Sequence, residues 1–134
     1  MIPQNFTHKS QEALQRAAAI SLEYKNPQVE PPHLMAALLE QEDGVVVSVL
    51  KKLNVTLKEL RDSTLAMIRS ISRSKDGGSS IHGNQIMLSQ ATGYILEQAQ
   101  NESKKMGDEF ISVEHILLAF LINRNPISEL LGKQ

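Results

Sequence analysis

Apolar residues recur at helical spacing over residues 7–24 and mark one face of a predicted helix. The stripe consists of Ala13, Leu14, Ala17 and Ile20. Thr7 can cap the first turn, because its hydroxyl can accept a backbone N–H that has no partner within the helix. Asn26-Pro27 ends the segment, since proline disfavours helical geometry at the residue before it.

The next two apolar runs also predict helices. One extends from Glu30 to about Glu40 with two prolines in its first turn, where a missing N–H costs little. After the break at Asp43-Gly44 comes VVVSVL at 45–50, whose β-branched residues favour a strand. Its apolar positions also fit helical spacing. We therefore predict a short helix from residue 45 to about 53.

A fourth helix is predicted from Thr56 to about residue 71. Thr56 followed three positions later by Glu59 is typical of a capping box. Residues 72–87 hold four Ser and three Gly with almost no periodicity, which indicates a linker.

The second half of the chain repeats the first at a constant offset of 82 positions. VEPPHLMAALL at 29–39 returns as ISVEHILLAFL at 111–121, and 115 − 33 = 82 for the two histidines. The register continues upstream, where Phe6 aligns with Leu88 and Thr7 with Ser89. The duplicated element is therefore a whole multi-helix unit.

The offset predicts three helices after the linker. The first extends from Ser89 to about Met106, with Gly107 placed to end it, and Ser112 caps the second. A short third helix is expected after Asn125-Pro126.

We predict an all-α fold of two pseudo-twofold repeats of a four-helix unit, with the last helix of the second repeat missing. Repeat one spans about 6–71 and repeat two about 88–134 of a single domain that covers residues 1–134. The partner of the fourth helix would lie beyond residue 134, so we expect a fragment of a longer protein with an exposed apolar patch where that helix would pack.

Composition excludes several classes of protein. The chain of 134 residues has no Cys, and only 4% of its residues are aromatic, which favours helical packing without disulfides. Its 14 basic and 15 acidic side chains give no field that would attract nucleic acid or a membrane surface. No apolar run predicts a membrane span or a signal peptide. We expect a cytoplasmic protein.

The candidate chemistry favours binding over catalysis. His8, His33, His82 and His115 lack metal-ligand spacing, and two of them occupy equivalent positions in the repeats. Neither a P-loop nor a nucleophile elbow is present, so no catalytic residue, metal site or cofactor is predicted for this segment.

Thr7, Asp108 and Glu114 lie at or near predicted helix N-termini, where free N–H groups form polar edges. Capping alone would explain them: Thr7 accepts an N–H, Glu114 complements the helix dipole and Asp108 closes the turn after Gly107. A capping residue can still present its outer side to a ligand, so the two interpretations are compatible.

Three segments carry a family resemblance: Phe6-Thr7, EPPHLMAALLEQEDG at 30–44 and GDEFISVEHILLAFL at 107–121. The chain resembles the duplicated N-terminal domain of the Clp AAA+ chaperones, most closely the ClpB type. That resemblance implies a domain that binds unfolded or aggregated polypeptide and passes it to an AAA+ ring. It also implies that Thr7, Asp108 and Glu114 take part in substrate handling.

For the parent protein, the resemblance implies a homohexameric disaggregase that uses ATP and Mg²⁺ in two ATPase modules, carries a coiled coil and cooperates with a DnaK-type chaperone. The isolated domain is expected to be a monomer without a cofactor. The alternative is an adaptor-docking domain of a ClpA- or ClpC-type protease ATPase.

One departure bears on that alternative. ClpC-type domains carry Thr-Glu-His in both repeats as part of phosphoarginine recognition, whereas this chain has Pro31-Pro32-His33 and Val113-Glu114-His115. Two equivalent phosphoarginine sites are therefore not expected, and we expect function to depend mainly on the second copy.

Overall fold

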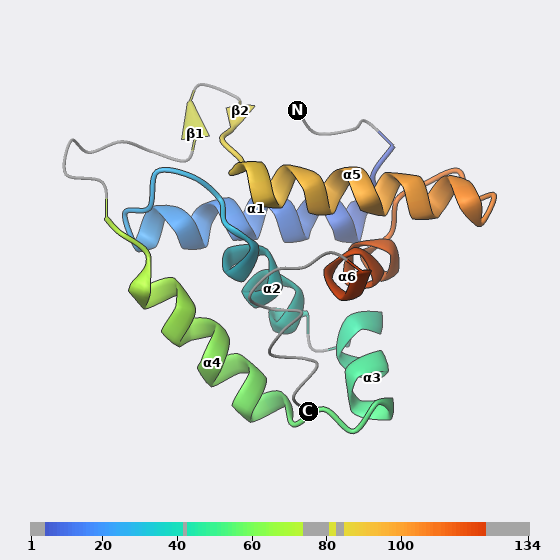
Figure 1. Ribbon diagram of the computed structural model, residues 1–134, viewed down its shortest axis with the longest axis horizontal. Helices are drawn as coiled ribbons and strands as arrows, with labels where there is room; N and C mark the ends of the chain where they lie inside the picture. The colour runs from blue at the N-terminus through green and yellow to red at the C-terminus, as the bar shows by residue number, and fades with distance from the viewer. Residues whose placement is uncertain (1–4, 42, 74–80, 83–84, 123–134) are drawn as a thin grey trace.

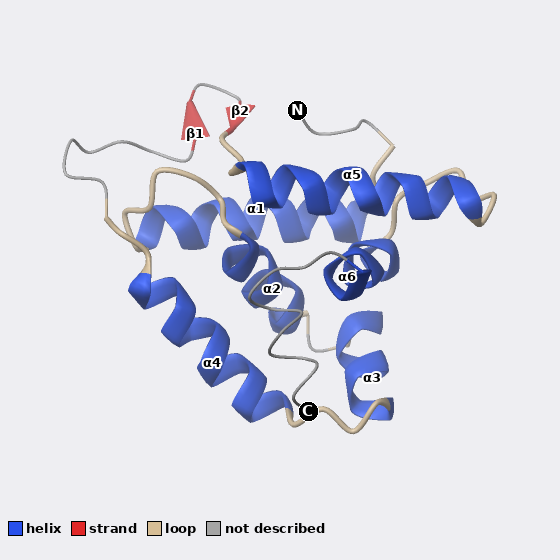
Figure 2. Cartoon of the chain, in the orientation of Figure 1, coloured by secondary structure: helices blue, strands red, loops and turns tan. Residues whose placement is uncertain are grey.

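The computed structural model describes residues 5–41, 43–73, 81–82 and 85–122, and within them the fold is almost entirely helical (Figures 1 and 2). The prediction of an all-α fold is confirmed. The elements are α1 (His8–Glu23), α2 (Pro31–Glu40), α3 (Val45–Lys52), α4 (Leu57–Ser70), β1 (Ile81–His82), β2 (Gln85–Ile86), α5 (Gln90–Lys105) and α6 (Val113–Ile122).

The first helix of each repeat starts at its predicted capping residue. Thr7 Oγ1 accepts the backbone N–H of Ser10 at 3.2 Å, and Ser89 Oγ accepts that of Thr92 at the same distance. Pro31 is the first residue of α2, as predicted from the tolerance of a helix start for proline. The VVVSVL run is helical, because Val46 and its neighbours bury one face of α3.

The core joins the two copies of the repeat. α1 packs on α2 and α5 packs on α6, while α2 also contacts α4 and α5. The apolar positions predicted for the core, Ala13, Leu14, Ala17, Ile20, Leu96 and Ala99, are all buried. Phe120 of α6 is fully buried as well, at the position equivalent to Leu38 of α2.

Reciprocal backbone pairing connects the repeats. Thr7 N–H donates to the carbonyl of Ile111 at 3.1 Å, and Ser89 N–H donates to the carbonyl of Val29 at 3.1 Å. Both bonds occur at positions 82 residues apart, and each forms part of an isolated parallel bridge. The start of the first helix of each repeat is therefore held by the segment leading into the second helix of the other.

The side chains reinforce this exchange. Ser10 Oγ donates to the carbonyl of Ile111 at 2.9 Å, and Thr92 Oγ1 donates to that of Val29 at 2.8 Å. Ser10 and Thr92 are both fully buried, and a buried hydroxyl needs a hydrogen-bond partner. Each of them finds that partner in the other repeat.

The structure adds one element to those predicted and corrects one expectation. The predicted linker contains a short antiparallel hairpin in which Ile81 pairs with Ile86. The sequence signal for it was the Gly-Asn dipeptide at 83–84, which favours two-residue hairpin loops. The Thr56 side chain makes no capping hydrogen bond to α4, so the predicted capping box is wrong, although the Thr56 carbonyl accepts the N–H of Leu60 at 3.0 Å.

The predicted seventh helix lies outside the described residues. At the end of the described chain, Leu121 and Ile122 of α6 are 44% and 51% exposed. The predicted absence of a last helix remains an expectation.

Two glycines give a matched test of the backbone. Gly107 ends α5 with φ +71°, a left-handed conformation that costs other residues about 1–2 kcal/mol, whereas Gly93 lies within α5 with no atom within 4 Å of an added Cβ. We expect Gly107→Ala to lower the free energy of unfolding by about 1 kcal/mol and Gly93→Ala to raise it by about 0.5–1 kcal/mol. Urea denaturation of both variants measures the change in the free energy of unfolding. A change in the same direction for both variants would contradict the assigned backbone geometry.

Candidate functional site

The start of α1 and the entry to α6 form one edge of the molecule, and this edge brings the predicted site residues into one region. Backbone pairing holds Thr7 against Ile111. Asp108 lies three residues before Ile111 in the same loop, and Glu114 is exposed in the first turn of α6. Residues from both ends of the sequence therefore contribute to one surface.

His115 fixes Asp108 at this edge. Its Nε2 lies 2.9 Å from Asp108 Oδ2, and its Nδ1 accepts the backbone N–H of Ser112 at 2.9 Å. Since Nδ1 is an acceptor, the proton of a neutral ring lies on Nε2 and is donated to Asp108. The His115 side chain is 6% exposed and that of Asp108 is 50% exposed, so the buried ring orients a carboxylate that solvent can reach.

The same contacts argue against a serine nucleophile. Ser112 Oγ lies 3.1 Å from His115 Nδ1, which superficially completes a Ser-His-Asp set with Asp108. That nitrogen already accepts the Ser112 backbone N–H, so its lone pair is engaged in the helix cap and cannot act as a base toward the hydroxyl. The arrangement is structural.

The first repeat contains the equivalent arrangement without an exposed charge. His33 Nδ1 accepts the N–H of Glu30 at 2.8 Å, and His33 Nε2 lies 2.8 Å from Asn26 Oδ1. The offset of 82 maps Asn26 onto Asp108, so an amide stands where the second copy has a carboxylate. His33 is fully buried, and this burial lowers its pKa from 6.5 to about 4, which keeps the ring neutral.

Pro32 and Glu114 complete the contrast between the two copies. Pro32 is buried at the start of α2, whereas Glu114, its equivalent at the start of α6, is exposed. The edge at the entry to α6, here called the second edge, therefore presents carboxylates at both equivalent positions, Asp108 and Glu114. The corresponding first edge, at the entry to α2, has Asn26 and Pro32 there.

Two exposed apolar side chains at the second edge were not predicted from the sequence. Met106 and Phe110 flank Asp108 in the turn between α5 and α6, and they are 58% and 54% exposed. Their exposure depends on the path of this turn, which periodicity does not determine. The signal that could have found them is an aromatic residue within an otherwise polar loop.

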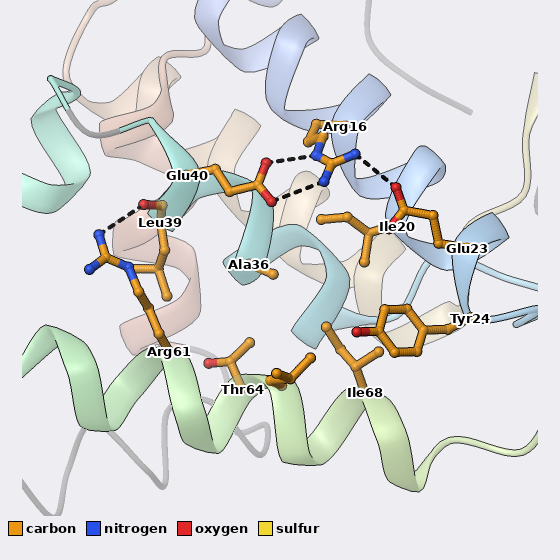
Figure 3. A pocket seen from close by; sticks show the side chains of 11 residues that line it. Arg16, Ile20, Glu23, Tyr24, Ala36, Leu39, Glu40, Arg61, Thr64 and Ile68 are labelled. Atoms are coloured by element: carbon orange, nitrogen blue, oxygen red, sulfur yellow. Dashed lines mark hydrogen bonds and ion pairs between the residues drawn. The ribbon is translucent and has the colours of Figure 1, made fainter.

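The described residues form two further hollows, and neither is lined by Thr7, Asp108 or Glu114. One follows α5 from Leu88 to Gln100 with a volume of about 520 Å³, and the other lies between α1, α2 and α4 with a volume of about 360 Å³ (Figure 3). The edge that carries Thr7, Asp108 and Glu114 therefore lies outside both of these hollows.

In the part of the chain that the structure describes, no three His, Cys, Asp or Glu residues are grouped so as to hold a metal ion. None of the helices with assigned positions is long and apolar enough to cross a bilayer.

Known proteins are similar to this chain in sequence and in fold. The family profile described as the Clp repeat (R) N-terminal domain matches residues 5–134. The chaperone protein ClpB of Bacillus cereus is 32% identical over 124 residues, which cover 92% of this chain and 14% of that protein. The chain thus spans about one seventh of the length of this relative.

Solved structures agree on the architecture. The Hsp104 N-terminal domain from Candida albicans superposes with a TM-score of 0.81 at 18% identity, over 97% of this chain and 81% of that one. A ClpV N-domain in complex with a VipB peptide gives a TM-score of 0.76 at 19% identity, over 96% and 78%. At these identities the likeness concerns the fold. Together with the family profile, it shows that the chain belongs to the Clp repeat N-terminal domain family, a non-catalytic domain of Clp AAA+ ATPases, and that its sequence is ClpB-like.

Proposed function

We propose that this domain recruits unfolded or aggregated polypeptide for a ClpB-type disaggregase. The observation that supports it is the second edge, where exposed Met106 and Phe110 alternate with the carboxylates of Asp108 and Glu114. An unfolded chain presents apolar side chains and backbone N–H groups together. This edge offers apolar contact area to the apolar side chains and hydrogen-bond acceptors to the backbone N–H groups.

Asp108 and Thr7 play different parts in this proposal. His115 holds one oxygen of Asp108, which leaves the other available to a substrate N–H. Thr7 already accepts the Ser10 N–H and donates to Ser10 Oγ at 3.0 Å, so it positions the edge by fixing α1 against Ile111.

The parent protein belongs to the same proposal. A ClpB-type parent would assemble as a homohexamer, hydrolyse ATP with Mg²⁺ in separate modules and work with a DnaK-type chaperone in the cytoplasm. The domain would then act only by binding and delivering substrate.

Docking of a defined adaptor is the second candidate. A ClpV N-domain has been solved with a VipB peptide, so a related fold can take a specific segment of a partner. In this function the bound protein is recognised by one sequence, whereas disaggregation requires a tolerant surface. A long coiled-coil insertion in the full-length sequence would favour the ClpB type.

Substitutions at the edge distinguish substrate recruitment from capping. We expect Phe110→Ser to weaken binding of fluorescent, reduced and carboxymethylated α-lactalbumin about fivefold, because it removes an exposed apolar contact. Glu114→Gln should weaken this binding about threefold, because the substrate N–H groups lose a charged hydrogen-bond acceptor. Fluorescence anisotropy titration measures both effects.

Matched controls carry the same changes elsewhere. Leu53→Ser replaces an exposed apolar residue after α3, and Glu59→Gln neutralises an exposed carboxylate in the first turn of α4. Both should leave binding unchanged. Equal weakening by the controls, or unchanged binding in Phe110→Ser and Glu114→Gln, would contradict the proposed edge.

A further inference from the structure

The cleft in the first repeat has the form of a second binding site, apart from the Thr7 edge. α1 and α4 both pack on α2 and enclose about 360 Å³ between them (Figure 3). Its apolar lining includes Ile20 of α1, Tyr24 directly after α1, and Leu65 and Ile68 of α4. Tyr24 and Leu65 are only partly buried, so both have apolar surface left to cover.

Two carboxylates at the rim of the cleft, Glu23 and Glu40, share one arginine (Figure 3). Arg16 binds Glu40 through two bonds, Nε to Oε1 at 2.6 Å and Nη2 to Oε2 at 3.1 Å, and its Nη1 binds Glu23 Oε1 at 3.1 Å (Figure 3). These bonds, chiefly the one to Glu40, raise the pKa of Arg16. One cation therefore serves two carboxylates. The Glu23 side chain is 56% exposed, so it can accept a further cation.

Arg61 carries a positive charge on the opposite side of the cleft from Glu23 (Figure 3). Arg61 of α4 donates from Nη2 to the carbonyl of Leu39 at 3.2 Å, which holds its guanidinium at the rim. Among the residues whose positions are described, no carboxylate lies within the 4.0 Å of an ion pair with Arg61. The apolar lining thus lies between a cation and an incompletely neutralised carboxylate.

The second repeat does not reproduce this arrangement. At the offset of 82, Arg16 corresponds to Gln98, and Glu23 corresponds to Lys105. The fold is shared by both copies, but this pattern of charges belongs to the first alone. It is therefore not a requirement of the duplicated scaffold.

We propose that the cleft binds a peptide segment of a partner protein in which one apolar side chain stands between an acidic and a basic side chain. The acidic group pairs with Arg61, the apolar side chain lies against Tyr24 and Leu65, and the basic group pairs with Glu23. The complementarity of charge on both sides of the cleft selects this occupant over a purely apolar one. This inference does not depend on the substrate-recruiting function of the other edge.

A blocked pentapeptide, acetyl-Gly-Asp-Leu-Lys-Gly-amide, tests the cleft with the 134-residue chain. We expect weak binding, with a Kd of about 1 mM, and backbone amide shifts in ¹⁵N NMR spectra grouped at the end of α1 and along 61–68. Arg61→Glu should weaken binding about tenfold, because the acidic residue then meets a like charge. Replacing Asp by Lys in the peptide should restore binding to that variant.

Arg69→Glu is the matched control, since Arg69 is an exposed residue of the same helix outside the cleft lining. It should bind the original peptide as the unchanged chain does. The proposal is overturned if no shifts occur, if the shifts centre on Thr7 and Glu114, or if Arg61→Glu binds both peptides equally. Concentration-dependent shifts at the cleft without peptide would show that a second copy occupies it, and would also overturn the proposal.

Discussion

Phe120→Ala is expected to lower the free energy of unfolding by about 3–5 kcal/mol. The ring is fully buried in α6, and its removal loses transfer free energy and leaves a cavity that the surrounding helices fill only in part. Domains of this size have a total stability of about 5–15 kcal/mol, so a loss of this size is a substantial part of the total. Urea denaturation followed by circular dichroism measures the change.

The neighbouring residue supplies the control. Leu121 lies on the same helix but is 44% exposed, so Leu121→Ala should cost less than about 1 kcal/mol. Similar losses in the two variants would contradict the assigned orientation of α6.

The second large effect concerns the buried His33 ring. His33→Gln should lower the free energy of unfolding at pH 7.5 by about 2–4 kcal/mol, because the contacts to Glu30 and Asn26 are lost or displaced in a buried site. The difference in free energy of unfolding between the native chain and this variant should shrink as the pH falls, because the native chain loses stability at low pH.

The sign follows from the lowered pKa. The folded state resists protonation of His33 down to about pH 4, whereas the unfolded chain takes up the proton near pH 6.5. The contribution of the neutral His33 ring to the free energy of unfolding is therefore complete above pH 6.5. It declines by about 3 kcal/mol in total as the pH falls toward 4. The difference between native chain and variant should narrow by that amount.

Urea denaturation at several pH values between 7.5 and 4 measures this narrowing. A His33→Gln difference that stays constant with pH would show that the ring titrates normally in the folded state.

The repeated pattern predicted the helices and the caps of α1 and α5, because these depend on nearby residues. Thr7 and Ser89 cap as expected, and the helical period identified the buried stripe of α1. Thr56 has the same hydroxyl chemistry, but its side chain makes no capping hydrogen bond to α4.

The site could be predicted only in part, since its contacts join residues that local spacing does not relate. The sequence indicated Thr7, Asp108 and Glu114, and the backbone pairing with Ile111 explains how Thr7 reaches the other two. Their part in substrate binding remains a prediction. The bond from His115 to Asp108 spans seven residues across a turn, so helical periodicity could not reveal it.

The crossed pairing at Ile111 and Val29 has a consequence for how the chain gains its structure. α1 relies on Ile111, about a hundred residues away, and α5 relies on Val29, so neither half holds a complete set of backbone partners when it emerges alone during synthesis. The closing contacts are distant in sequence, which slows their formation. The two halves should therefore become ordered as one cooperative unit, late in folding, despite their separate and similar sequences.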